Sequence, residues 1–181
     1  MIAFRTDTFY GLGVDPFNAA AVDRLRALKG REDNKPILLL ISDLNQIERV
    51  IVERTAEFIE LAGKFWPGPL TIIGRASADL PEGITAGTGT VGVRLPADEK
   101  VRELVRQCGG VLTATSANPA GREPARSAAE VRSYFPSGID LVVDDGEVTA
   151  TEPSTVVDAT TSPPRIIREG AIAAKLIVPH A

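Results

Sequence analysis

The sequence predicts an α/β fold, because short apolar runs of strand length alternate with segments whose apolar residues recur at helical spacing. The chain has 181 residues, 44% of them hydrophobic, which at this length is enough to bury a core. No internal repeat and no long linker interrupts it. We therefore expect a single domain over residues 1–181.

The first half of the chain alternates strands and helices. Asn18 is a plausible N-cap for the first helix, because a short polar side chain can accept a hydrogen bond from a free backbone amide. The Pro67-Gly68-Pro69 segment ends a later helix abruptly. The elements expected here are strand 2–5, a glycine-rich turn at TDTFYGLG, helix 19–28, strand 37–41, helices 43–52 and 55–65, and strand 70–74.

The second half continues the alternation. Asp98 is the expected cap of a helix whose apolar residues follow helical spacing, and Ser127 with Glu130 forms a capping box. The elements expected here are a loop at 81–90, strand 91–95, helix 98–108, strand 111–114, a short helix after 127, strands 141–143, 155–157 and 165–167, and a last helix over 171–178.

Composition excludes several classes of protein. The only histidine is His180, next to the last residue, so a Ser-His-Asp triad and a multi-histidine zinc site are not expected. The net charge of −4 argues against a non-specific nucleic-acid coat. No apolar run approaches membrane-spanning length, and no signal peptide is visible. The single cysteine, Cys108, suits a reducing cytosol, so we expect a cytoplasmic protein without a membrane partner.

A cluster of cations follows the first predicted helix. The segment KGREDNKP places Lys29, Arg31 and Lys35 at and beyond the helix end. The helix dipole, which favours positive charge at a C-terminus, explains Lys29. It does not explain Arg31 and Lys35, which acidic residues separate in a loop ended by proline. Such a loop suits a polyphosphate.

Other polar segments have two interpretations. TSAN, residues 115–118, ends a predicted strand, where open α/β sheets bind ligands, but an ordinary turn before Pro119 explains it equally well. TDT, residues 6–8, has the same ambiguity. Arg94 lies inside an apolar strand, and a charge buried there needs a partner or an anionic ligand.

Two patterns are set aside. GTGTVG, residues 87–92, matches the dinucleotide-binding G-x-G-x-x-G, but it precedes a predicted strand and does not open a helix. Asp144-Asp145-Gly146 could be a metal pair, but this tripeptide is more typical of a turn. We therefore expect no metal site made by the protein alone.

Seven motifs occur in one order: TDTFYGLG, KGREDNKP, WPGPLT, VGVRLP, TSANPAG, PSTVVD and IIREG. Together, over about residues 4–171, they resemble the YrdC-like family of threonylcarbamoyl-AMP synthases. The resemblance implies a YrdC-like twisted mixed α/β sheet with flanking helices around a basic cavity.

The resemblance also implies a reaction. A nucleotidyltransferase of this family makes L-threonylcarbamoyl-AMP from L-threonine, bicarbonate or CO2, and ATP, with Mg²⁺, and releases pyrophosphate. A separate complex then transfers the threonylcarbamoyl group to tRNA, which gives threonylcarbamoyladenosine (t6A). The partners implied are these substrates, the transfer complex and tRNA itself.

The resemblance assigns roles to matching residues. Lys29, Arg31, Ser116 and Asn118 are implied as catalytic. The implied ATP site comprises Arg31, Lys35, Thr90, Thr115, Ser116, Asn118 and Arg168. The implied threonine site comprises Thr8, Tyr10, Arg94 and Ser154, with Arg94 facing the carboxylate.

Two alternatives stay open. One is an RNA-binding module of the same fold without turnover, against which the net charge counts. The other is a sibling that makes a different carbamoyl adenylate, as in hydrogenase maturation proteins, but their cysteine-rich extra domains are missing here. Two departures from the family pattern bear on activity: only five residues precede Thr6, and Arg5 replaces the usual proline.

Overall fold

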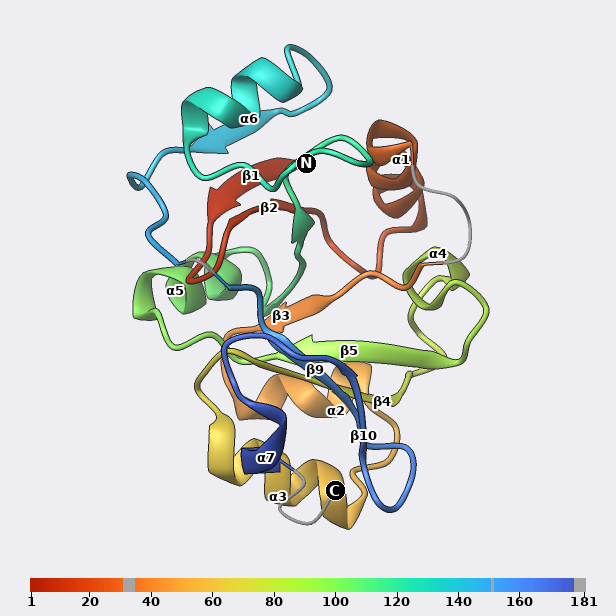
Figure 1. Ribbon diagram of the computed structural model, residues 1–181. Helices are drawn as coiled ribbons and strands as arrows, with labels where there is room; N and C mark the ends of the chain where they lie inside the picture. The colour runs from red at the N-terminus through yellow and green to blue at the C-terminus, as the bar shows by residue number, and fades with distance from the viewer. Residues whose placement is uncertain (31–34, 151, 178–181) are drawn as a thin grey trace.

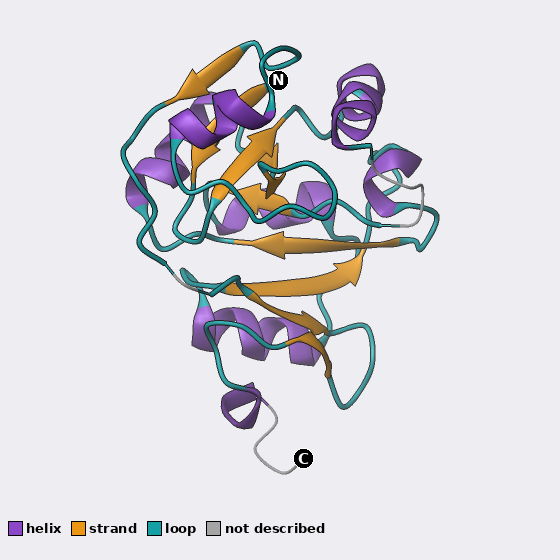
Figure 2. Ribbon diagram, turned by 45° about the horizontal axis from the view of Figure 1, so that its top comes forward, coloured by secondary structure: helices purple, strands orange, loops and turns teal. Residues whose placement is uncertain are grey.

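The computed structural model, which describes residues 1–30, 35–150 and 152–177, contains two mixed β-sheets with flanking helices (Figures 1 and 2). The smaller sheet has the strand order β7-β2-β1-β8, and the larger has the order β10-β9-β4-β5-β3-β6. The two sheets give the mixed α/β fold that the sequence predicts.

The strands are β1 (Ile2–Arg5), β2 (Tyr10–Gly13), β3 (Leu39–Ile41), β4 (Leu70–Arg75), β5 (Thr90–Arg94), β6 (Val111–Thr113), β7 (Thr115–Ser116), β8 (Leu141–Val143), β9 (Thr155–Asp158) and β10 (Arg165–Arg168). The helices are α1 (Ala19–Lys29), α2 (Ile47–Val50), α3 (Ala56–Phe65), α4 (Glu82–Thr85), α5 (Glu99–Gln107), α6 (Ala128–Tyr134) and α7 (Ala174–Ile177).

The large sheet is built around β4 and β5. These two strands are antiparallel, with Ile72 opposite Val93 and Ile73 opposite Gly92. On either side, β9 runs parallel to β4, and β3 runs parallel to β5. Helix α3 covers the face that points away from the small sheet (Figures 1 and 2). The opposite face of β4 and β5 is therefore turned toward the small sheet.

Local capping signals place the helices as expected. Asn18 accepts a hydrogen bond from the Ala21 amide, and Asp98 accepts one from the Lys100 amide. Ser127 accepts from the Glu130 amide, but the Glu130 carboxylate reaches back to the amide of Arg126 instead of Ser127. Only one of the two hydrogen bonds of a capping box is therefore formed, the one from the Glu130 amide to the Ser127 side chain.

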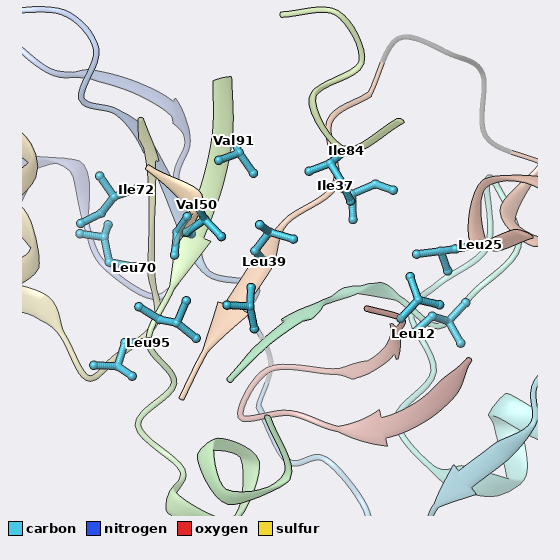
Figure 3. Packing of buried hydrophobic residues seen from close by; sticks show 14 of the residues in the cluster. Leu12, Leu25, Ile37, Leu39, Val50, Leu70, Ile72, Ile84, Val91 and Leu95 are labelled. Carbon is cyan, nitrogen blue, oxygen red and sulfur yellow. The ribbon is translucent and has the colours of Figure 1, made fainter. Parts of the chain in front are cut away.

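The core joins residues from both sheets and from the helices that flank them. Ile37 and Ile84 lie together in Figure 3, and the Ile37 amide donates to the Ile84 carbonyl at 2.8 Å. Leu12 of the small sheet and Leu39 and Leu70 of the large sheet belong to the same buried cluster. Since both sheets contribute to one core, apolar burial helps fix them against each other.

Several boundaries differ from the sequence prediction. The sequence predicts a turn at TDTFYGLG, but its last four residues form strand β2. Its glycines allow close packing, since a Cβ on Gly13 would lie 2.8 Å from Leu112. The predicted helix 43–52 is only a short 3₁₀ turn (Leu44–Gln46) and α2, because Ile51 is extended and bridges to Ala76.

Three further expectations are corrected. The predicted loop 81–90 contains the one-turn helix α4 (Glu82–Thr85), which directly follows Pro81. The strand predicted over 37–41 forms only from Leu39. Within residues 171–177 the last helix is limited to Ala174–Ile177. Among the described residues, no helix has the length and apolarity required to cross a bilayer.

Thr155 anchors the C-terminal segment to the large sheet. Its buried hydroxyl accepts from the amides of Gly170 and Ile172, both at 3.0 Å, and donates to the Ile172 carbonyl at 2.7 Å. We expect Thr155→Val to lower the free energy of unfolding by about 2–4 kcal/mol, since the buried Ile172 amide and the partly buried Gly170 amide lose their acceptor. Urea denaturation measures this. Thr161→Val, at an exposed position, is the control, with an expected change within about 0.5 kcal/mol. Equal effects of the two substitutions would contradict this role of Thr155.

Candidate functional site

A cavity of about 620 Å³ lies between the two sheets. Its floor comes from β4 and β5, where Thr71, Ile73, Gly92 and Arg94 line it. Successive strand residues point to opposite faces, so these alternate positions share the face turned toward the small sheet. The remaining walls come from Thr6, residues 8–11, 36–38, 114–116 and 123–124, Pro153, Ser154, Val156 and Arg168.

Arg94 is the most unusual residue of the floor. Its side chain is only 2% exposed, and its Nη2 lies 2.9 Å from Asp7 Oδ1. Among the described residues, its Nε and Nη1 have no hydrogen-bond partner. Burial lowers the pKa of Arg94, the Asp7 carboxylate opposes this effect, and Arg168 adds to it. Asp7 is the ionic partner that the sequence allowed as one of two possibilities for a charge at this position. A buried guanidinium whose Nε and Nη1 are unsatisfied is also suited to an anionic ligand.

The turn between β1 and β2 forms the wall above Arg94. The Thr6 hydroxyl holds this turn, since it donates to the Phe9 carbonyl at 2.6 Å and accepts from the amides of Thr8 and Phe9. Thr8 and Tyr10 line the cavity. The Tyr10 hydroxyl, however, donates to the Gly146 carbonyl at 2.8 Å, and burial raises its pKa. Tyr10 therefore also anchors the loop after β8.

Lys29 and Asn118 support the TSAN turn from behind. Lys29 Nζ donates to the backbone carbonyls of Ser116 and Asn118, the first at 2.6 Å, and to Asn118 Oδ1 at 3.2 Å. The Asn118 side-chain amide donates to the Pro119 and Arg122 carbonyls. Thr115 and Ser116 line the cavity, whereas Lys29 and Asn118 do not. The buried ammonium therefore fixes the backbone that presents Thr115 and Ser116.

A hydrogen-bonded chain crosses the far wall. Arg168 Nη2 donates to the Ser154 carbonyl at 2.8 Å and lies 3.4 Å from Ser154 Oγ. Ser154 Oγ is 2.9 Å from the hydroxyl of Thr71. Burial lowers the pKa of Arg168. The structure brings together Ser154, which the resemblance assigns to the threonine site, and Arg168, which it assigns to the ATP site. The sequence prediction did not include Thr71, whose only signal is that it is a polar residue inside an apolar strand.

Two other predicted residues, Lys35 and Thr90, lie outside this lining. Lys35 is exposed but adjoins Pro36, which lines the cavity. Thr90 shares the face of Gly92 and Arg94 but stands at the opposite end of β5 and is not part of the lining. Arg31 lies outside the described residues.

Comparison with known proteins gives a family match over most of the chain. The family model Sua5/YciO/YrdC, whose description reads "Telomere recombination", matches residues 1–170. A threonylcarbamoyl-AMP synthase of Halorhodospira halophila is 42% identical over 143 residues, which cover 79% of this chain and 75% of the relative.

A second relative is also known structurally. A threonylcarbamoyl-AMP synthase of Pyrococcus abyssi is 37% identical over 95% of this chain and 51% of its own length. The crystal structure of P. abyssi Sua5 complexed with L-threonine superimposes with a TM-score of 0.91 at 36% identity, and covers 98% of this chain and 53% of that one. The present chain thus spans about half the length of this relative.

Because Lys29 donates to backbone carbonyls of the TSAN turn, replacing it tests whether these hydrogen bonds hold the turn in place. We expect Lys29→Met to lower the free energy of unfolding by about 2–4 kcal/mol, because buried carbonyls lose a charged donor. Urea denaturation measures the change. Lys100→Met is the matched control, since Lys100 pairs with Asp145 at the surface, where such pairs contribute at most about 1 kcal/mol. If both variants are equally stable, Lys29 does not support the turn.

Proposed function

The chain belongs to the Sua5/YciO/YrdC family, and from this premise we propose that it is a threonylcarbamoyl-AMP synthase. It would join L-threonine, bicarbonate or CO2, and ATP to give L-threonylcarbamoyl-AMP and pyrophosphate. The product is the activated group for t6A formation in tRNA, which a separate transfer complex completes. The observation that carries the proposal is the buried Arg94 guanidinium, whose Nε and Nη1 lack partners among the described residues that surround it.

The amino acid would bind through its carboxylate at Arg94. A carboxylate has the geometry and charge that a guanidinium recognises, and the low dielectric of the cavity strengthens the pair. Thr8, Tyr10 and Ser154 line the same cavity and would enclose the rest of the molecule. The P. abyssi relative has a structure with L-threonine, which supports this choice of substrate.

The nucleotide would occupy the side of the cavity formed by the TSAN turn. Thr115 and Ser116 reach the cavity there and would contact phosphate oxygens, and Arg168 would reach the nucleotide from the opposite wall. Lys29 and Asn118 would act by holding the turn, as their hydrogen bonds indicate. Arg31, Lys35 and Thr90 stay candidate ATP ligands, and Lys35 directly precedes Pro36, which lines the cavity.

The chemistry needs positioning more than proton transfer by the protein. The neutral amine of threonine attacks CO2, forms the N–C bond and loses a proton to give the carbamate. A carbamate oxygen then attacks the α-phosphorus of ATP while the bond to pyrophosphate breaks. Negative charge develops on phosphate oxygens, and fixed cations and hydroxyl donors stabilise it.

The family's use of Mg²⁺ is compatible with this cavity only if ATP brings the ion. Among residues 1–30, 35–150 and 152–177, no three acidic, histidine or cysteine side chains gather as a metal site. Within the described lining, Glu123 is the one carboxylate. Magnesium prefers phosphate oxygens and water together with few protein ligands, so we assign no residue and no step to it.

The proposed reaction is tested by pyrophosphate release. We expect purified protein with ATP, Mg²⁺ and bicarbonate to release pyrophosphate with L-threonine, and much less with L-valine, since the site is polar around Arg94. D-Threonine is the control for non-specific ATP cleavage. Salt-dependent RNA binding without amino-acid-dependent release would instead support the RNA-binding alternative and contradict the proposal.

Arg94 and Lys35 should affect different substrates. We expect Arg94→Ala to raise the KM for threonine by about 10- to 150-fold, the effect of losing a charge-assisted pair of about 1.5–3 kcal/mol, with a smaller effect on ATP. Lys35→Ala should weaken ATP more than threonine. Steady-state kinetics and a melting curve of each variant provide the measurement, with Arg75→Ala as the exposed control on β4. Equal loss for both substrates would rule out this assignment of Arg94.

A further inference from the structure

Thr71 faces Arg94 across the floor of the cavity. Ile72 pairs with Val93 in the antiparallel β4–β5 ladder. Continuing this register by one residue places Thr71 opposite Arg94, on the same face of the sheet. Cβ atoms of such cross-strand neighbours lie roughly 4.5–5.5 Å apart. The carboxylate and the side-chain hydroxyl of a β-hydroxy amino acid are separated by only a few bonds. A molecule held by its carboxylate at Arg94 therefore has its side chain within reach of Thr71.

The Thr71 hydroxyl belongs to a pair with spare hydrogen-bonding capacity. Thr71 is 3% exposed, Ser154 is 4% exposed, and their oxygens are 2.9 Å apart. Each hydroxyl has one hydrogen and two acceptor positions. Their shared bond uses one hydrogen and one lone pair, and Arg168 Nη2 donates to a second lone pair on Ser154 Oγ, so one hydrogen and two lone pairs stay unused. Both residues line the cavity. A buried hydroxyl pair of this kind favours a ligand that both donates and accepts a hydrogen bond.

Gly92 is consistent with the orientation of Thr71. A Cβ on Gly92 would lie 3.0 Å from Thr71 Cγ2, so the methyl group of Thr71 uses the space that glycine leaves free. The Thr71 hydroxyl is then directed to Ser154 and not into the floor. The rotamer that presents the hydroxyl pair thus depends on the absence of a side chain at position 92.

We propose that Thr71 is a specificity-determining residue, which with Ser154 recognises the side-chain hydroxyl of the amino acid held at Arg94. This inference rests on the proposed function, because that function supplies an amino acid as ligand. A side chain without a hydroxyl leaves the buried pair unsatisfied, and such a site discriminates against it. The selectivity for threonine over its deoxy analogue thus depends on one strand position of β4.

The test is the binding preference for L-threonine over L-2-aminobutyrate, which lacks only the hydroxyl. Isothermal titration calorimetry measures both ligands on the full chain without ATP. We expect Thr71→Val, which keeps the shape and removes the hydroxyl, to reduce the preference by roughly tenfold through weaker threonine binding. Thr71→Ser keeps the hydroxyl and should retain the preference. Thr85→Val, a buried threonine outside the cavity, is the matched control.

Each other outcome overturns the inference. An unchanged preference in Thr71→Val shows that Thr71 does not recognise the hydroxyl. Equal weakening of both amino acids, or loss of the preference in Thr71→Ser as well, shows a structural role only. A wild-type protein that binds both amino acids equally, or neither, has no such recognition.

Pyrophosphate release is measured in parallel. If the wild type does not release it but still binds selectively, only the proposed reaction fails.

Discussion

The site depends on one constraint, which is a guanidinium buried between two sheets. Arg94 extends from the large sheet, and its ionic partner Asp7 comes from the turn of the small sheet. A buried charge is costly unless it is paired, so this contact ties the sheets together where the cavity lies. The pair satisfies only part of the guanidinium, and Nε and Nη1 stay without partners among the described groups. The interaction that joins the sheets thus leaves free the guanidinium nitrogens that, under the proposed function, bind the carboxylate of the amino acid.

Around that charge, the described cavity is lined mainly by neutral polar and apolar groups. Backbone turns, not free side chains, place the hydroxyls: Thr6 closes the first turn, and Lys29 holds the TSAN turn through carbonyls. A donor fixed in this way does not have to reorganise when a ligand arrives. Lys29 is an example, since a residue that the resemblance implies as catalytic donates hydrogen bonds to backbone carbonyls of the turn.

The helix caps at Asn18 and Asp98 could be predicted from the sequence, whereas features that depend on distant contacts could not. The caps at Asn18 and Asp98 involve residues two or three positions away, so short-range patterns predict them. Strand β2 depends on close packing between Gly13 and Leu112, which no local pattern shows. Arg94 could be singled out because a charge inside an apolar strand is unusual. Thr71 could not, because its partner Ser154 is 83 positions away.

The scarcity of histidine bears on how the proposed reaction is controlled. The one histidine of the chain, His180, lies outside the described residues, and the described cavity wall is built mainly from arginine, hydroxyl and apolar side chains. Arginines stay charged near neutral pH, and burial raises the pKa of Tyr10 further above it. The group that must change its protonation state is the amine of the amino acid, which reacts only when neutral. Under the proposed function, a pH dependence near neutrality therefore comes from the substrate. The charges of the arginine and tyrosine side chains around the carbamate and the phosphate stay the same over this pH range.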